Sequence, residues 1–241
     1  MAKIFDFKLV FTQIPDLLRY LPVTLELAFF SVFVGLLLGL AIALIKMKKN
    51  KILNRFANIY ISLLRGTPIL VQLYIAYFGI PMLFKYINFR LGTNFHVADI
   101  PGFVYAVFAM SLNQSAYNAE AIRAALQSVN KGEIEAANAL GMTYFQVLRR
   151  IILPEAFVFA LPTLGNTIIS AIKNTSLAFT CAVVEITAQG KILGGITYRY
   201  FEVYVSLAII YWVITFFIEQ IIKHLEKKMA IPEQVETSFE K

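Results

Sequence analysis

The feature that most constrains this chain is a series of long apolar segments separated by short polar ones. Each of the five segments is long enough to cross the hydrocarbon core of a bilayer as a helix of about 20 residues. The composition agrees, because 59% of the residues are hydrophobic and 15% are charged, against roughly 45–50% and about 25% in soluble domains. The sequence therefore predicts an all-α integral membrane protein with five transmembrane helices, at about 21–45, 56–84, 101–122, 156–184 and 201–222.

The distribution of Lys and Arg predicts how these spans are oriented. The connections after spans one and three and the segment after span five carry most of the basic residues, and such connections lie in the cytoplasm. The N-terminus is then outside and the C-terminus inside. Residues 1–20 are predicted to form an outer-side segment with a short interfacial helix, and 227–241 a polar cytoplasmic tail. The net charge of +7 reflects these connections, and we reject nucleic-acid binding on that ground.

A polar stretch at 131–154, between spans three and four, predicts two short helices joined by a sharp turn. Gly141 is expected to end the first helix, because glycine adopts the left-handed conformation there without strain. Thr143 and Gln146 have the spacing of a capping box, which begins a second helix. That helix is expected to end by Pro154. Taken alone, this pattern is that of an ordinary helical hairpin.

The residues of this stretch resemble the EAA loop of the membrane subunits of binding-protein-dependent ABC importers. The resemblance implies that the loop is a coupling helix that contacts a cytosolic ATPase, with Glu135, Ala136, Ala137 and Gly141 at the contact. It also implies that residues 21–226 form one transmembrane domain. The matching positions are Glu135, Ala136, Ala137, Gly141, Ile151, Leu153 and Pro154.

Three further motifs resemble the branch of these permeases that imports polar amino acids. In some relatives that move cationic amino acids, Glu follows a Gly-Asn pair, whereas this chain has Thr167. The resemblance therefore implies import of a polar L-amino acid, with a neutral polar one or cystine favoured over a cationic one. The motifs are Arg65-Gly66-Thr67-Pro68 with Val71-Gln72-Leu73, the stretch from Ser111 to Arg123, and Lys173-Asn174-Thr175-Ser176-Leu177.

Polar groups within the spans predict where a solute passes. Pro68 is expected to kink span two, and Arg65 to reach toward water. Pro162 and Gly165 are expected to loosen span four, and broken polar helices form the binding sites of many transporters. Lys173 is expected either to pair with a substrate carboxylate or to be structural. The candidate substrate-path residues are Asn113, Tyr117, Thr167, Ser170 and Lys173.

The small residues of span one recur at four-residue intervals and predict a close helix contact within the same subunit. They are Ser31, Gly35, Gly39 and Ala43.

The absence of other motifs predicts a transport subunit rather than an enzyme. No GxxxxGK[ST], HExxH or GxSxG pattern occurs, and His96 and His224 are isolated from other metal ligands. The resemblance implies that ATP and Mg²⁺ bind to a partner ATPase dimer and that this chain holds no cofactor. It further implies an extracellular or periplasmic amino-acid-binding protein, a second permease subunit that is identical or a sister, and a bacterial inner or cell membrane.

The alternative function is a self-sufficient secondary transporter or channel for small polar solutes. Its signs would be inverted repeats and carboxylates buried within the spans. Five spans do not divide into equal halves, and no carboxylate is predicted at mid-span.

Overall fold

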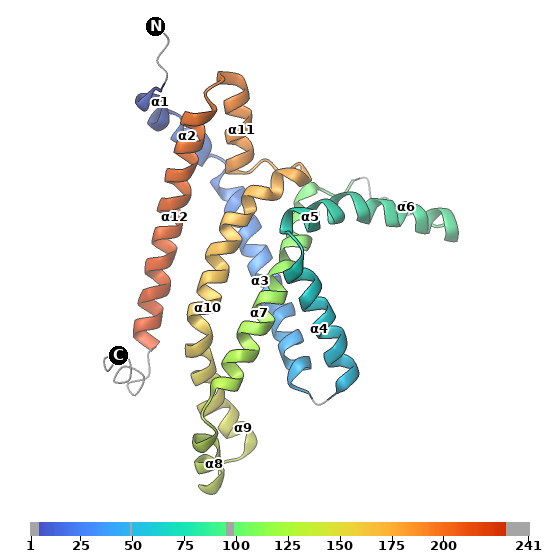
Figure 1. Cartoon of the computed structure of the whole chain (residues 1–241), viewed down its shortest axis with the longest axis vertical. Coiled ribbons are helices and arrows are strands. Elements are labelled where there is room, and N and C mark those ends of the chain that lie inside the picture. The colour runs from blue at the N-terminus through green and yellow to red at the C-terminus, as the bar shows by residue number, and fades with distance from the viewer. Residues whose placement is uncertain (1–4, 49, 95–98, 230–241) are drawn as a thin grey trace.

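The computed structural model describes residues 5–48, 50–94 and 99–229, and every regular element in this part of the chain is helical (Figure 1). The longest helices run roughly along one axis and are joined at the two ends of the molecule. The elements are α1 (Phe7–Thr12), α2 (Ile14–Leu18), α3 (Leu21–Met47), α4 (Lys51–Gly66), α5 (Ile69–Tyr74), the π-helix η1 (Ile75–Gly79), α6 (Ile80–Leu91), α7 (Gly102–Ser128), α8 (Lys131–Ala139), α9 (Tyr144–Val147), the π-helix η2 (Leu148–Ile152), α10 (Leu153–Asn174), the 3-10 helix η3 (Thr175–Cys181), α11 (Ile186–Thr197) and α12 (Tyr200–Met229).

The centre of the fold is the contact between α3 and α7, and the small residues of α3 make it possible. A Cβ at Gly35 would lie 2.7 Å from the Cβ of Gln114, and one at Gly39 would lie 2.7 Å from the Cβ of Asn118. Ser31 and Ala43, at the two ends of the same ridge, are fully buried. The ridge therefore packs within its own subunit, as predicted, and brings α3 against the polar face of α7.

The prediction of a single helix over 56–84 is wrong. Helix α4 ends at Gly66, Thr67 and Pro68 are extended, and α5 begins at Ile69. From that point α5, η1 and α6 turn away from the long helices and extend out of the bundle (Figure 1). Pro68 lacks an N–H and restricts the residue before it, so a helix stops here more readily than it bends.

Span four is also more continuous than predicted. Pro154 lies in the first turn of α10 and does not end the preceding helix, because the wider turns of η2 lead directly into α10. Helix α10 continues through Pro162 and Gly165 to Asn174, where η3 takes over. Gly165 serves close packing instead of a break, since a Cβ there would lie 2.7 Å from Cγ2 of Ile222 in α12.

In the described part of the chain, four helical stretches are long and apolar enough to cross a membrane: Leu21–Met47, Ile69–Leu91, Tyr144–Cys181 and Tyr200–Met229. The predicted third span coincides with α7, which is equally long but carries many polar residues. Those polar residues are largely buried against other helices.

The two ends of the molecule differ in what they carry. Helices α1, α2 and α11 lie at one end, and the turn from α3 to α4, the pair α8 and α9 and the end of α12 lie toward the other (Figure 1). The predicted interfacial helix is instead two short helices that pack on α12, with Val10 and Leu17 fully buried. Of the predicted tail at 227–241, the first three residues complete α12, and the rest lies outside the described residues.

Candidate functional site

The turn between α8 and α9 has the predicted geometry in detail. Gly141 is left-handed, with φ of 79°. Its N–H donates to the carbonyl of Asn138 at 3.0 Å, and that of Met142 donates to the carbonyl of Ala137 at 3.1 Å, which is the Schellman pattern. Thr143 and Gln146 then form the predicted capping box. The two helices are therefore held at a fixed angle by local chemistry.

One face of this helix pair is buried within the chain and another is exposed and apolar. Ile134 and Ile151 pack against a cluster of Ala125, Val129, Ala156 and Ala160 from α7 and α10. Ala137 belongs to the buried face, with 4% of its surface exposed, so its expected place on an outer contact surface is wrong. Glu135, Ala136 and Gly141 are exposed. Beside them lie three large apolar side chains that the motif did not indicate: Leu140, Tyr144 and Phe145, exposed by 84%, 77% and 67%.

A cavity of about 570 Å³ opens where the break between α4 and α5 faces α7 and α10. Its size lies within the range of about 300–1,000 Å³ that is typical of small-molecule sites. Four of the five predicted substrate-path residues line it together. The lining residues are Arg65, Gly66, Thr67, Pro68, Ile69, Asn113, Gln114, Tyr117, Thr167, Ser170 and Asn174.

Gln72 and Asn113 stabilise the break that shapes this cavity. The end of α4 leaves backbone carbonyls without helical partners, and the Gln72 amide donates to the carbonyls of Leu64 at 2.8 Å and Thr67 at 3.0 Å. The Asn113 amide donates to the same Leu64 carbonyl at 3.3 Å and to Oε1 of Gln72 at 3.0 Å. The amide N–H groups of Asn113 therefore stabilise the break between α4 and α5 and are already hydrogen-bonded within the chain.

Arg65 is the charged residue that lines the cavity, and it was not among the predicted substrate-path residues. Its guanidinium lies over the ring of Tyr117, 5.2 Å from the ring centroid. Within the described residues it makes no ion pair or hydrogen bond. An arginine with its donors free at the edge of a polar cavity is suited to bind a carboxylate. Its position in the sequence, directly before Gly66 and Pro68, could have indicated this role, because the break in the helix leaves the Arg65 side chain exposed.

Lys173, the fifth predicted substrate-path residue, is not among the residues that line this cavity, so of its two predicted roles only the structural one is compatible with a substrate bound there. Thr167, Ser170 and Asn174 follow one another at three and four residues and share one face of α10, whereas Lys173 falls beside that face and is exposed.

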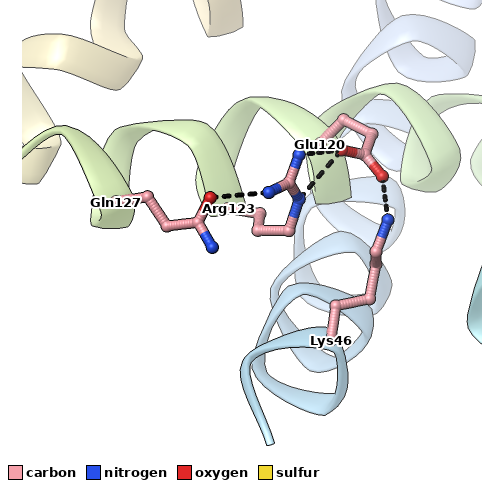
Figure 2. A network of polar contacts seen from close by, with 4 residues as sticks. All are labelled: Lys46, Glu120, Arg123 and Gln127. Carbon is pink, nitrogen blue, oxygen red and sulfur yellow. Dashed lines mark hydrogen bonds and ion pairs between the residues drawn. The ribbon is translucent and has the colours of Figure 1, made fainter. Parts of the chain in front are cut away.

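A charged cluster lies at the end of α7 nearest α8 (Figure 2). Oε2 of Glu120 accepts from Nε of Arg123 at 3.0 Å and from Nη2 at 2.8 Å. The three-residue spacing places these two side chains on the same face of α7. The other carboxylate oxygen binds Nζ of Lys46 from the end of α3, and Gln127 accepts from Nη1 of Arg123 at 2.6 Å. Two cations thus share one carboxylate.

Comparison with known families agrees with this geometry. Residues 35–231 match the family described as "Binding-protein-dependent transport system inner membrane component". The chain belongs to this family. Its members are membrane-embedded components of transport systems that depend on a binding protein, which does not fit a self-sufficient transporter. The predicted resemblance to the membrane subunits of binding-protein-dependent importers is confirmed at the level of the family.

Individual relatives match over nearly their whole length. The "Probable amino-acid permease protein YxeN" of Bacillus subtilis (strain 168) is 40% identical over 227 residues, which are 94% of this chain and 97% of that protein. The "L-cystine transport system permease protein TcyL" of the same organism is 39% identical over 229 residues, 95% of this chain and 93% of that protein. A solved structure titled "Crystal structure of an amino acid ABC transporter with histidines" is 38% identical, with a TM-score of 0.78 over 94% of this chain and 100% of that chain.

Proposed function

We propose that this family member is the membrane subunit of an ATP-driven importer that moves a polar L-amino acid into a bacterial cytoplasm. The observation that carries the proposal is the polar cavity at the α4–α5 break, bordered by Arg65 and by helix faces of α7 and α10. The names of the relatives at 39–40% identity, a probable amino-acid permease and an L-cystine permease, support the substrate class.

The cavity favours a zwitterion with an uncharged side chain. Among its lining residues Arg65 is the sole charged group, and its guanidinium is suited to the α-carboxylate. The side chains of Ser170 and Asn174 have no hydrogen-bond partner among the described residues, so they and the Tyr117 hydroxyl remain for the amine and the side chain of the substrate. Thr167 donates to Oδ1 of Asn118 at 3.1 Å and brings no negative charge. A neutral polar amino acid or cystine is therefore favoured over a cationic one.

The end of the molecule with α8 and α9 is proposed to face the cytoplasm and an ATPase dimer, as the basic connections at that end suggest. Leu140, Tyr144 and Phe145 form an apolar knob next to Glu135, Ala136 and Gly141, and such a knob fits a hydrophobic cleft. The N-terminus then lies outside, where a binding protein docks. We propose five crossings: α3, the second formed by α4 and α5 with a break at 66–68, α7, α10 and α12.

In the mechanism, closure of the ATPase dimer moves the knob, and the rigid turn at Gly141 transmits the movement to α7 and α10. These helices border the cavity on one side, so their shift alternates its opening between the two membrane faces. ATP and Mg²⁺ belong to the ATPase, and a second permease subunit, identical or a sister, completes the pathway.

The test is reconstitution of the chain with its ATPase and binding protein in proteoliposomes, with cystine, glutamine, histidine and arginine as substrates. We expect uptake and stimulated ATP hydrolysis for a neutral polar substrate and weak effects with arginine. Stimulation by none of the four, or by arginine alone, would contradict the proposal.

The coupling role is tested at Gly141. Gly141→Val places a branched side chain at φ of 79°, which costs roughly 1–2 kcal/mol, so we expect assembled complexes in which ATP hydrolysis no longer responds to substrate. Gly141→Asn tolerates this conformation and Gly132→Ala lies in an ordinary helix, so both should stay coupled. Equal transport by the valine and asparagine variants would show that the turn does not act as a lever.

A further inference from the structure

Helix α4 has three distinct faces, and one of them is polar along its whole length. Ala57, Ile61 and Leu64 form the face buried against α3 and α7. Ile52, Phe56 and Leu63 form an exposed apolar face. Between these two faces runs a polar stripe at three- and four-residue spacing. Its members are Lys51, Asn54, Arg55, Asn58, Ser62 and Arg65. A membrane protein exposes a stripe of this kind only to water or to another polar surface.

Two further hollows follow this stripe away from the substrate cavity. One, of about 460 Å³, is bordered by Asn58, Ser62 and Arg65 of the stripe and also by Lys46, Tyr117 and Glu120. It shares Arg65, Gly66 and Tyr117 with the substrate cavity. The other, of about 720 Å³, continues from Asn58 and Ser62 to Lys51 at the start of α4 and is bordered on its second side by Ile59 and Leu63 of the apolar face. The three hollows form a series from the break at 66–68 to the turn between α3 and α4.

We propose that the polar stripe of α4 is the wall of the exit route for the amino acid, and that the stacked pair Arg65 and Tyr117 separates this route from the substrate cavity. The inference rests on the proposed function, since it assumes that an amino acid occupies the cavity. It adds the path by which the amino acid leaves and the residues that close it.

The partition is held by contacts that a substrate can replace. Arg65 borders both hollows and is held over Tyr117 by a cation–π contact. A carboxylate that pairs with the guanidinium offers a stronger, bidentate interaction. The guanidinium can then move off the ring together with the carboxylate. Arg65 lies at the end of α4, directly before Gly66 and the extended Thr67, and the space beside Gly66 is open, since no neighbouring atom lies within 4 Å of its Cβ position.

Glu120 keeps the exit route from binding the substrate too tightly. Lys46 and Arg65 border the same hollow as Glu120, and Arg123 pairs with Glu120. Three cations and one carboxylate leave a positive balance, so the route attracts a carboxylate group and repels a cationic side chain. Lys46 and Arg123 are both already paired with Glu120 (Figure 2). A route conducts only when its binding is weak enough for release, and pairing with Glu120 weakens the hold of these two cations on a passing carboxylate.

Water accessibility tests the route independently of transport. Cys181 is the single cysteine and is buried, so Cys181→Ala gives a background for Asn58→Cys and Ser62→Cys. The control is Phe56→Cys, which lies on the exposed apolar face of the same helix and nearer its start. A charged thiol reagent that does not cross membranes is added to the α3–α4 side of vesicles that contain the assembled transporter. We expect Asn58→Cys and Ser62→Cys to react at least tenfold faster than Phe56→Cys. Equal rates, or a disulfide between two copies through Ser62→Cys, would overturn the proposal.

A second measurement addresses the partition. Tyr117→Leu removes the ring, whereas Tyr117→Phe keeps it as the matched control. In the Tyr117→Leu background we expect the reagent to reach Ser170→Cys in the substrate cavity at least fivefold faster than in the Tyr117→Phe background. Unchanged access would show that Arg65 and Tyr117 do not separate the two hollows. Because this readout needs no uptake, failure of amino-acid import in the reconstituted transporter would contradict the proposed function without deciding the route.

Discussion

Two acidic residues, Glu185 and Glu120, sit in polar clusters toward opposite ends of the molecule and are handled in opposite ways. Glu185 is fully buried and binds neutral donors: the hydroxyl of Tyr211 at 3.0 Å, that of Thr24 at 3.4 Å and the N–H of Ala188 at 2.8 Å. Glu120 keeps 21% of its side chain exposed and binds two cations.

The difference indicates which cluster is structural and which serves a pathway. The donors of Glu185 come from α3, α11 and α12, so the carboxyl joins three elements in an enclosed site, and burial raises its pKa above the ordinary value. Glu120 borders a hollow on the polar stripe of α4, where the local net charge acts on an amino acid that moves along the proposed exit route. The neutral donors of Glu185 hold three helices together, whereas the two cations that share Glu120 set the local charge beside the hollow.

Loss of the cluster around Glu185 has the largest expected effect on stability. Glu185→Ala removes the N-cap of α11 and deprives two buried hydroxyls of an acceptor, so we expect the unfolding free energy to fall by about 2–4 kcal/mol. Thermal unfolding of the assembled transporter in detergent measures it, with Glu26→Ala on the exposed side of α3 as the control. Equal stability of the two variants would remove Glu185 from its structural role.

Loss of the cluster around Glu120 should reduce stability less and transport more than loss of the Glu185 cluster. Glu120→Gln removes the charge that Lys46 and Arg123 share, but these side chains keep 15% and 29% of their surface exposed and can be hydrated, so we expect the unfolding free energy to fall by about 1–2 kcal/mol. The two freed cations then hold the substrate carboxylate, and uptake should slow several-fold while ATP hydrolysis continues. Glu26→Gln is the control. A stability loss as large as that of Glu185→Ala, with normal uptake, would make the two clusters equivalent.

How far the sequence predicted the structure depends on the range over which each feature is determined. The turn at Gly141 and the capping box at Thr143 were predicted correctly, because their chemistry lies within a few residues. The break after Gly66 was predicted only as a kink. Pro68 signals a disturbance, but the separation of the two helices depends on Gln72 and on Asn113, which is distant in the sequence.

The choice between two cations was beyond the sequence for the same reason. Lys173 and Arg65 both lie in motifs that resemble those of amino-acid permeases, and nothing local shows which one reaches the cavity. The rotation of α10 decides, and it is set by packing such as that of Gly165 against Ile222. Four of five substrate-path residues were nevertheless brought together, because helical spacing groups Asn113 with Tyr117 and Thr167 with Ser170.

The smallest expected effect is a pH dependence of stability that comes from Glu185. Because burial raises the pKa of Glu185 in the folded state, its favourable contribution to stability is complete below the unfolded value of about 4.3 and is lost as the pH rises through the folded pKa. The wild type should therefore lose stability relative to Glu185→Gln on going from mildly acidic to neutral pH, because the glutamine does not titrate. Parallel unfolding curves of the two proteins across this range would show that Glu185 keeps one protonation state throughout, and the cluster would then owe its stability to hydrogen bonding alone.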